Sequence, residues 1–335
     1  MAGLLTRIPE LTILIVLTVV AYIAMGMFSQ VGSTDALTSA DAWTIVVASL
    51  LLSTVIAIVA VLGGVGGGVL YTPVILGFTS IDTLLIRSTG LVVAMFSGLV
   101  SAGPFMRKGL ADLRLVFYCA IPIILGAMAG SQTAISMADS MGETGDAIVR
   151  LLLGLILNFI AVMFILSGSN TEFPKPKKVS GLSEMLNLKA SYWEESLNRP
   201  VHYQATRLVL GAFLFLAVGF TGGFFGLGGG WAVVPVLNLV MTVPLKISAA
   251  SSGVLLAIGN AAAIWPYIVA GALIALFAAP WMIGQVIGGI LGAHILAKIK
   301  AGFVRKILIV LLLMTSVKLV SRGLETLLGF DIPFI

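Results

Sequence analysis

The chain has 335 residues, of which 59% are hydrophobic and only 10% are charged, and its mean hydropathy is +1.13. An average soluble domain is about 25% charged, so this composition excludes a soluble globular protein and predicts an integral membrane protein. The formal net charge is +5, but in a membrane chain the placement of the charges matters more than their sum, and we expect no nucleic-acid partner.

Apolar stretches close to the 20 or so residues that cross a bilayer as a helix recur along the chain. They lie at about 11 to 28, 43 to 62, 87 to 103, 114 to 133, 147 to 167, 206 to 223, 247 to 265, 273 to 296 and 303 to 320. Continuous apolar runs favour helices over a membrane barrel, whose strands would alternate apolar and polar residues. The first run follows Arg7 and could be a signal peptide, but its apolar core is long for one, so we expect a retained helix.

A glycine-rich segment, "VLGGVGGGVLYTP" at 61 to 73, returns later as "FGLGGGWAVVPV" at 225 to 236. At a constant offset of 162, the matching residues are Gly64, Gly66, Gly67, Gly68, Pro73 and Val74 against Gly226, Gly228, Gly229, Gly230, Pro235 and Val236. The register continues to Gly126 and Gly130 against Gly288 and Gly292, while Ser88-Thr89-Gly90 and Ser251-Ser252-Gly253 fall one residue off it. This pattern predicts two repeats.

The repeats give four regions. Residues 1–42 are an N-terminal transmembrane helix with an outer loop, 43–167 the first transmembrane repeat, 168–205 a cytoplasmic linker and 206–335 the second repeat. In the linker, Leu182, Met185, Leu186, Tyr192, Trp193 and Leu197 could form the apolar side of a helix lying in the membrane interface.

The charged residues of the short loops predict the orientation, because Lys and Arg stay on the cytoplasmic side. The connections 104 to 114, 168 to 205 and 297 to 306 are basic, so we place them inside. The connections 29 to 42, 134 to 146 and 266 to 272 contain no Lys or Arg, so we place them outside. The chain is then a multi-pass protein of the cell membrane with seven full crossings and a cytoplasmic N-terminus.

This orientation requires residues 43 to 78 to start and finish outside. The part after the glycines, 69 to 78, is about ten residues and is too short to cross at 1.5 Å per residue. We therefore predict a re-entrant hairpin that turns at the glycines, with 206 to 241 as its counterpart from the inside. The predicted fold is an all-α polytopic membrane protein with two inverted-topology repeats, each a glycine-broken re-entrant hairpin plus three transmembrane helices, and an extra N-terminal helix.

Broken helices in inverted repeats are typical of secondary transporters, whose substrate site lies at the midplane between the halves. A short helix begins directly after each glycine cluster, and the free N–H groups of a helix N-terminus bind anions. Glycine also lets a ligand approach the backbone closely. Helix packing through small residues is the alternative, and we prefer it for the four-residue pairs Gly126/Gly130 and Gly288/Gly292.

Polar residues inside the spans also favour an anion. None of the 14 Asp and Glu residues falls within a predicted crossing, which disfavours a cation substrate. The remaining polar groups are hydroxyl, amide and indole donors: Ser88, Thr89, Ser97, Asn158, Thr221, Trp231, Asn238, Ser248, Ser251, Ser252, Asn260, Trp265 and Gln285. Any single Ser or Thr could instead bond a carbonyl of its own helix, whereas an amide in lipid is costly.

From these groups we select the candidate substrate-binding residues. They are Gly66, Gly67, Gly68, Ser88, Thr89, Gly228, Gly229, Gly230, Trp231, Ser251, Ser252, Asn260, Arg87 and Lys246. Arg87 and Lys246 stand at the start of the crossing after each hairpin, where either could attract an anion or extend to the lipid headgroups. Cys119 is the single cysteine, and His202 and His294 have no Cys or carboxylate neighbours at ligand spacing. We therefore expect no metal site, no cofactor and no catalytic residue.

At these motifs the chain resembles the sulfite exporter TauE/SafE family, also called the four-toluene-sulfonate uptake permease family. The resemblance rests on the paired segments "GGVGGGVLYTPVIL" and "GFFGLGGGWAVVPVLNLV" and on the segments Ser88-Thr89-Gly90 and Ser251-Ser252-Gly253, each of which opens the next span. It covers both halves but not the N-terminal helix or the central loop. The resemblance implies transport of small sulfur-containing or organic anions, such as sulfite, sulfonates and sulfoacetate-like compounds, often outward.

The expected function is a secondary transporter, in the exporting direction, of sulfonates, sulfoacetate or sulfite by alternating access, with an anion site at the midplane. Its expected partners are this organosulfur or sulfite anion and membrane lipids. Two alternatives stay open. One is an anion channel with the same site, and the other is a membrane scaffold that transports nothing and whose glycines only pack helices.

Overall fold

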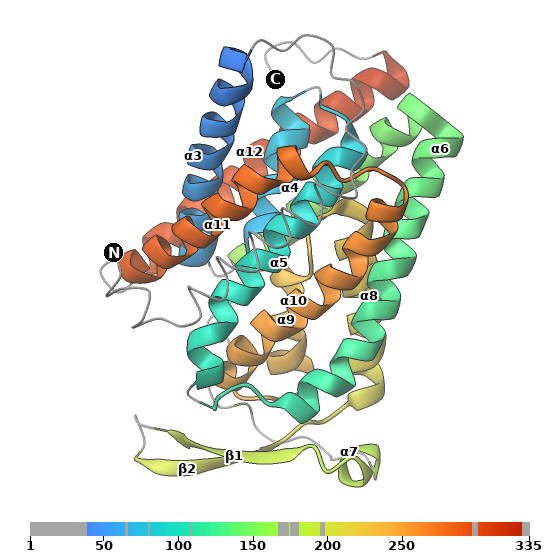
Figure 1. Ribbon diagram of the computed structural model, residues 1–335. Helices are drawn as coiled ribbons and strands as arrows, with labels where there is room; N and C mark the ends of the chain where they lie inside the picture. Colours follow the sequence, from blue (N-terminus) through green and yellow to red (C-terminus); the bar gives the residue numbers. More distant parts are fainter. Residues whose placement is uncertain are drawn as a thin grey trace.

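The computed structural model describes residues 39–63, 66–79, 81–107, 109–166, 174, 181–194, 198–296 and 301–329. They form a bundle of helices with a two-stranded β-hairpin below one end (Figure 1), which we call the hairpin end; the opposite end is the distal end. Within the described part of the chain, five helices are long and apolar enough to span a membrane. The prediction of an all-α polytopic membrane protein is confirmed, while the predicted N-terminal helix lies outside the described residues.

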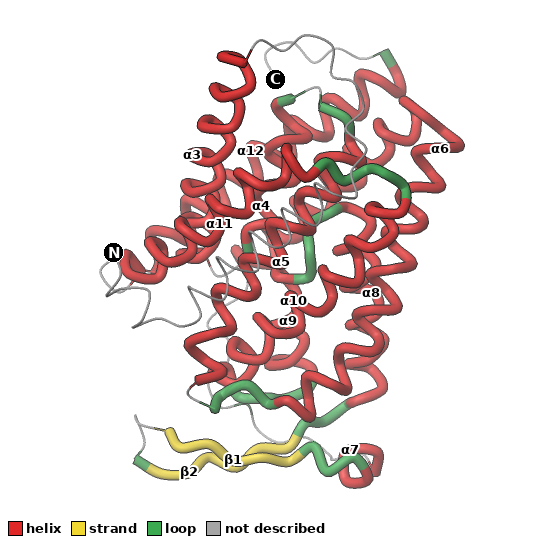
Figure 2. The backbone as a smooth tube through the Cα atoms, viewed as in Figure 1, coloured by secondary structure: helices red, strands yellow, loops and turns green. Residues whose placement is uncertain are grey.

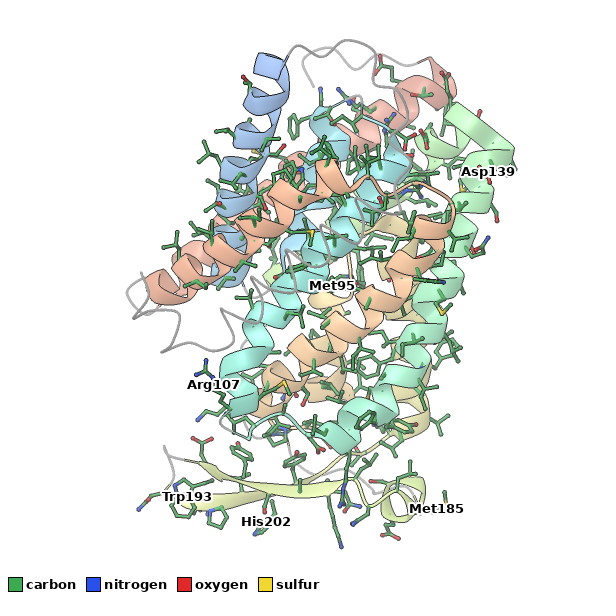
Figure 3. The ribbon with its side chains drawn as sticks, viewed as in Figure 1. Met95, Arg107, Asp139, Met185, Trp193 and His202 are labelled. Carbon is green, nitrogen blue, oxygen red and sulfur yellow. The ribbon has the colours of Figure 1, made fainter. Side chains whose placement is uncertain are left out.

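The first half begins with a helix pair that turns inside the bundle. Helix α3 (Ser39–Gly63) starts at the distal end, and α4 (Gly67–Phe78) returns toward it, as the tube in Figure 2 shows. Helix α5 (Thr83–Arg107) then runs to the hairpin end, where Arg107 lies in Figure 3. The chain therefore turns at the glycines that separate α3 from α4.

Helix α6 (Leu113–Leu166) contains 54 residues and folds back on itself at Gly142, whose φ is 51°. A Cβ on Gly145 would lie 3.1 Å from the carbonyl oxygen of Met137, so the two arms run past each other. Asp139 marks the bend at the distal end (Figure 3). The predicted outer loop at 134 to 146 is thus helical on both sides of a single sharp bend.

The second half enters the bundle from the other end. Helix α8 (Leu208–Phe225) begins next to the hairpin (Figure 1), and α9 (Gly230–Pro235) returns, continued by the π-helical turn η1 (Val236–Val240). Helices α10 (Leu245–Val269), α11 (Ala275–Leu296) and α12 (Ala301–Leu328) follow.

Element boundaries of the two halves keep the offset of 162. Thr83 begins α5 and Leu245 begins α10, Leu113 begins α6 and Ala275 begins α11. Leu166 ends α6 and Leu328 ends α12. These boundaries agree with two equivalent halves that enter from opposite ends; the duplication itself stays a prediction.

Small residues let the halves pack closely. A Cβ on Gly126 would lie 2.0 Å from the carbonyl oxygen of Leu216 on α8, and one on Gly288 would lie 2.3 Å from that of Thr54 on α3. The glycines are 162 apart, and so are their partners. The packing function predicted for the four-residue glycine pairs is confirmed: a Cβ on Gly126, Gly130 or Gly288 would overlap a neighbouring carbonyl oxygen, and Gly292 lies in close contact with α3.

The linker is not the interfacial helix that we predicted from its apolar residues. Only α7 (Gly181–Met185) is helical, and β1 (Lys189–Glu194) pairs antiparallel with β2 (Arg199–Gln204). Along β1, buried Tyr192 and Glu194 alternate with exposed Ser191 and Trp193, which is the period of a strand with one covered face. Trp193 and His202 lie on the side away from the helices (Figure 3).

Candidate functional site

The two glycine turns meet inside the bundle. A Cβ on Gly66 would lie 3.9 Å from the Cα of Gly230, and one on Gly68 would lie 2.6 Å from the carbonyl oxygen of Leu227. Met95 of α5 lies near the middle of the bundle in Figure 3, and the side chain of the preceding residue, Ala94, is 2.7 Å from the Cβ position of Gly68. The structure therefore brings both turns into one region at about half depth.

Both turns require glycine for their backbone conformation. Gly66 has a φ of 81° and Gly228 a φ of 66°, values in the left-handed region that other residues rarely adopt. The two residues are 162 apart in the sequence and occupy corresponding places before α4 and α9. Neither could carry a larger side chain without strain.

At the first turn, hydroxyl and amide groups surround the N-terminus of α4. The backbone N–H of Gly67 donates to Oγ of Ser97 on α5 at 3.0 Å. On α11, Gln285 is 1% exposed, and its Oε1 would lie 2.3 Å from a Cβ on Gly67. This oxygen has no hydrogen-bond partner among the described residues. The free N–H groups of a helix start and its positive dipole end favour a negatively charged ligand here.

At the second turn, two buried side-chain donors have no partner among the described residues. The amide of Asn260 on α10 lies 3.0 Å from the Cβ position of Gly228 and is 4% exposed. Its Nδ2 has no partner in the described part of the chain, and neither has the buried indole Nε1 of Trp231. A cavity of about 10 Å³, near the least space that holds one water molecule, lies beside Asn260 and Gly229. A buried donor without a partner costs free energy, so a ligand oxygen would relieve it.

The four predicted hydroxyl residues lie on α5 and α10, two on each helix. Ser88 is nine residues before Ser97, about 13 Å along the helix axis, and donates to the carbonyl oxygens of Leu85 and Ala272. Thr89 follows it and is buried, and its Oγ1 has no hydrogen-bond partner among the described residues. Ser251 accepts a bond from the backbone N–H of Asp112, and Ser252 donates to the carbonyl of Ala249. The backbone of Gly90, which ends the first Ser-Thr-Gly segment, packs against both turns: its carbonyl oxygen is 3.0 Å from the Cβ position of Gly68, and its own Cβ position is 2.4 Å from the carbonyl oxygen of Gly226. The hydroxyls of Ser88, Ser251 and Ser252 bond backbone groups.

Arg87 is buried, with 1% of its surface exposed, and does not extend to the lipid headgroups. Its Nη1 donates to the carbonyl oxygen of Phe224 at 3.2 Å, and its guanidinium carbon lies 5.8 Å from the centre of that ring. Thr72 donates to the carbonyl of Gly226, and Tyr267 to that of Gly223. Arg87 therefore belongs to a set of donors that bond carbonyls at the end of α8; Arg87 and Thr72 hold this end against the first half, and Tyr267 holds it against α10.

Lys246 lies at the hairpin end, away from the glycine turns. Its Nζ forms an ion pair with Glu194 of β1, whose side chain is 0% exposed. Nearby, the hydroxyl of Tyr203 in β2 donates to Oδ2 of Asp112 at 2.8 Å. Burial raises the pKa of this phenol, and the neighbouring Asp112 carboxylate raises it further, so it stays a donor at neutral pH. The ion pair of Lys246 with Glu194 thus connects the hairpin to the start of α10.

Ser97 and Gln285 are the residues at the turns that our selection from the sequence missed. Both were named among the polar residues of the spans, but the candidate residues were taken from the glycine clusters and the segments 88–90 and 251–253. Gln285 is 162 residues after Ile123, and both contact the glycine turns, Ile123 through a Cδ1 that is 3.6 Å from the Cβ position of Gly229. No group of three or more His, Cys, Asp or Glu that could hold a metal occurs among the described residues.

Comparison with known proteins agrees with this architecture. The family described as Sulfite exporter TauE/SafE matches residues 2–140 and 48–319. The chain is 23% identical over 270 residues to the "Probable membrane transporter protein YunE" of Bacillus subtilis (strain 168), which covers 78% of this chain and 92% of that protein. No solved structure matches the chain.

The fold and the paired turns define a polytopic membrane protein of the transporter class. The chain belongs to the sulfite exporter TauE/SafE family, as the family match shows. That family consists of membrane transporters, not enzymes.

Proposed function

We propose that this protein exports small sulfur-containing anions, such as sulfite, sulfoacetate or other sulfonates, by alternating access between its two halves. The observation that supports this most is the meeting of the two glycine turns, where the α4 N-terminus and the unpartnered amide of Asn260 face one buried region. Charged and polar ligands bind where such donors are already fixed in place. The family supplies the sulfur chemistry of the proposed substrate.

The proposed orientation has the hairpin end in the cytoplasm of the cell. That end contains Arg107, Arg114, Lys189 and Arg199, whereas Asp139 and Glu143 lie at the distal bend. Basic residues of short loops stay on the cytoplasmic side. In this orientation α3 and α4 enter from outside and α8 and α9 from inside, so each half carries one turn to the midplane.

The proposal predicts that Asn260→Leu weakens sulfite binding by about tenfold or more, because a hydrogen bond to a charged group contributes about 1.5–3 kcal/mol. The same change removes a buried donor that lacks a partner, so stability in detergent should stay equal or rise. Calorimetry with sulfite and sulfoacetate, with thermal melting of the same samples, measures both quantities.

Asn158→Leu is the matched control. Asn158 also lies within a span, but its Nδ2 donates to Ser316 Oγ and to the carbonyl of Gly154. This substitution should destabilise the protein by about 1 kcal/mol and leave anion affinity unchanged. Unchanged affinity in Asn260→Leu, or equal losses in both variants, would contradict the proposed site. Saturable flux of sulfite into vesicles separates a transporter from a channel.

A further inference from the structure

The side chain of Gln285 gives the first glycine turn a feature that a purely anion-binding turn would lack. Its carbonyl oxygen Oε1 is directed at Gly67, is buried and has no hydrogen-bond partner among the described residues. It stands at the start of α4, a 12-residue helix. Among the described residues, Nδ2 of Asn260 and Nε1 of Trp231 near the second turn also lack a partner, and both of these groups are donors.

The hydrogen bonds around Gln285 assign the orientation of its amide. Nε2 lies 3.4 Å from both the carbonyl oxygen and the Oγ of Ser53. That hydroxyl already donates its proton to the carbonyl of Trp281 at 2.7 Å. Ser53 therefore offers only acceptors to Gln285, so the NH₂ group must face Ser53 and the oxygen must face Gly67.

An oxyanion without a proton would fit this turn poorly, because its oxygens and Oε1 are all acceptors. An anion that also carries an O–H or N–H donor would satisfy both kinds of group. Its charged oxygens would accept bonds from the turn, and its donor would bond Oε1. A cation is disfavoured here because the helix N-terminus is the positive end of the dipole.

We propose that Gln285 is a specificity-determining residue, and that it selects anions carrying a hydrogen-bond donor next to the charged group over matched anions without one. This inference rests on the anion site of the proposed function. The equivalent position 162 residues earlier, in the first half, is Ile123, which lies against Gly229 of the second turn. The donor is therefore recognised at one turn only, which fixes the direction in which the substrate lies between the turns.

The test compares isethionate, which carries a hydroxyl, with ethanesulfonate, which does not, and uses sulfite as a reference. The wild-type protein should bind isethionate about tenfold more tightly than ethanesulfonate, the size expected for one hydrogen bond to a buried acceptor. Gln285→Ile places the residue of the equivalent position in the other half, and it should make the two affinities equal. Gly67→Ala, whose methyl would displace Oε1, should reduce the preference as well.

Each outcome of this comparison has a distinct meaning. Equal wild-type affinities for the two sulfonates, or binding of sulfite alone, would overturn the role of Gln285 and leave the proposed anion site in place. A preference for isethionate that persists in Gln285→Ile would also overturn it. No binding of any of the three anions would refute the proposed function and this inference together. If Gln285→Ile does not fold, Gln285→Met provides the same test, because it too lacks the acceptor oxygen.

Discussion

The first glycine turn differs from the second, although the sequence repeats between them. The first starts a 12-residue helix and faces a buried amide oxygen and a serine hydroxyl, whereas the second starts a six-residue helix that continues as a π-helical turn. Gln285 and Ile123, at equivalent positions, contact Gly67 and Gly229 respectively. Equivalent backbones thus carry different side chains, which a transporter needs if its substrate has two different ends.

The equivalent glycines of the two halves differ in how closely they pack against the neighbouring helix. This difference gives the largest expected change in stability. A Cβ on Gly130 would lie 2.1 Å from the carbonyl oxygen of Phe220, whereas the atoms nearest a Cβ on the equivalent Gly292 are 3.1 Å or more away. Gly130→Ala should destabilise the protein by about 2–3 kcal/mol through overpacking. Gly292→Ala should cost less than about 1 kcal/mol, because the gain in helix propensity offsets the crowding. Equal shifts in thermal melting would contradict this difference.

The tip of α8 is the second point of comparison, because Arg87 has no counterpart in the other half, where position 249 is alanine. Arg87→Met removes the guanidinium that donates to the carbonyl oxygen of Phe224. That buried carbonyl loses this hydrogen bond, which should lower the free energy of unfolding by about 1–3 kcal/mol. Unfolding in detergent measures the loss. An unchanged midpoint would show that Arg87 does not hold the tip of α8 in place.

The hairpin should contribute least. Tyr203→Phe removes one hydrogen bond to Asp112 and should cost about 1 kcal/mol. Because burial raises the pKa of this phenol, the contribution is present at and below neutral pH and is lost only as the pH rises through that raised value. Melting at neutral pH and in strong alkali checks both statements. If the wild type and Tyr203→Phe were already equally stable at neutral pH, the statement on pH dependence would be wrong.

Much of the fold could be predicted from the sequence because it depends on local and repeating features. The dense glycines around Gly66 and Gly228 require a break in the helix wherever they fall, and the ten residues after the first cluster are too few to cross. The basic loops also predict an orientation in the membrane, which stays a prediction. Gly126 and Gly288 were predicted to pack helices from their four-residue spacing, and both contact a backbone carbonyl.

The hairpin could not be predicted so easily, because its apolar residues fit a helical face as well as a strand. Glu194 is buried beside Tyr192, and its pairing with Lys246 helps to make this position tolerable. Such partners lie far along the chain, and no local pattern indicates them. The same holds for Ser88 and Ser251, which bond the loop before α11 and the start of α6 instead of a ligand.

The central claim is that an anion binds where Gly66 and Gly230 meet. Selenite is a heavier analogue of sulfite, and its selenium can be located by anomalous scattering in crystals of the protein. The account predicts a selenium peak between the two turns, within reach of Asn260 and the N-terminus of α4, that disappears in Asn260→Leu. A peak only at the basic hairpin end, near Arg114 and Lys189, would contradict it.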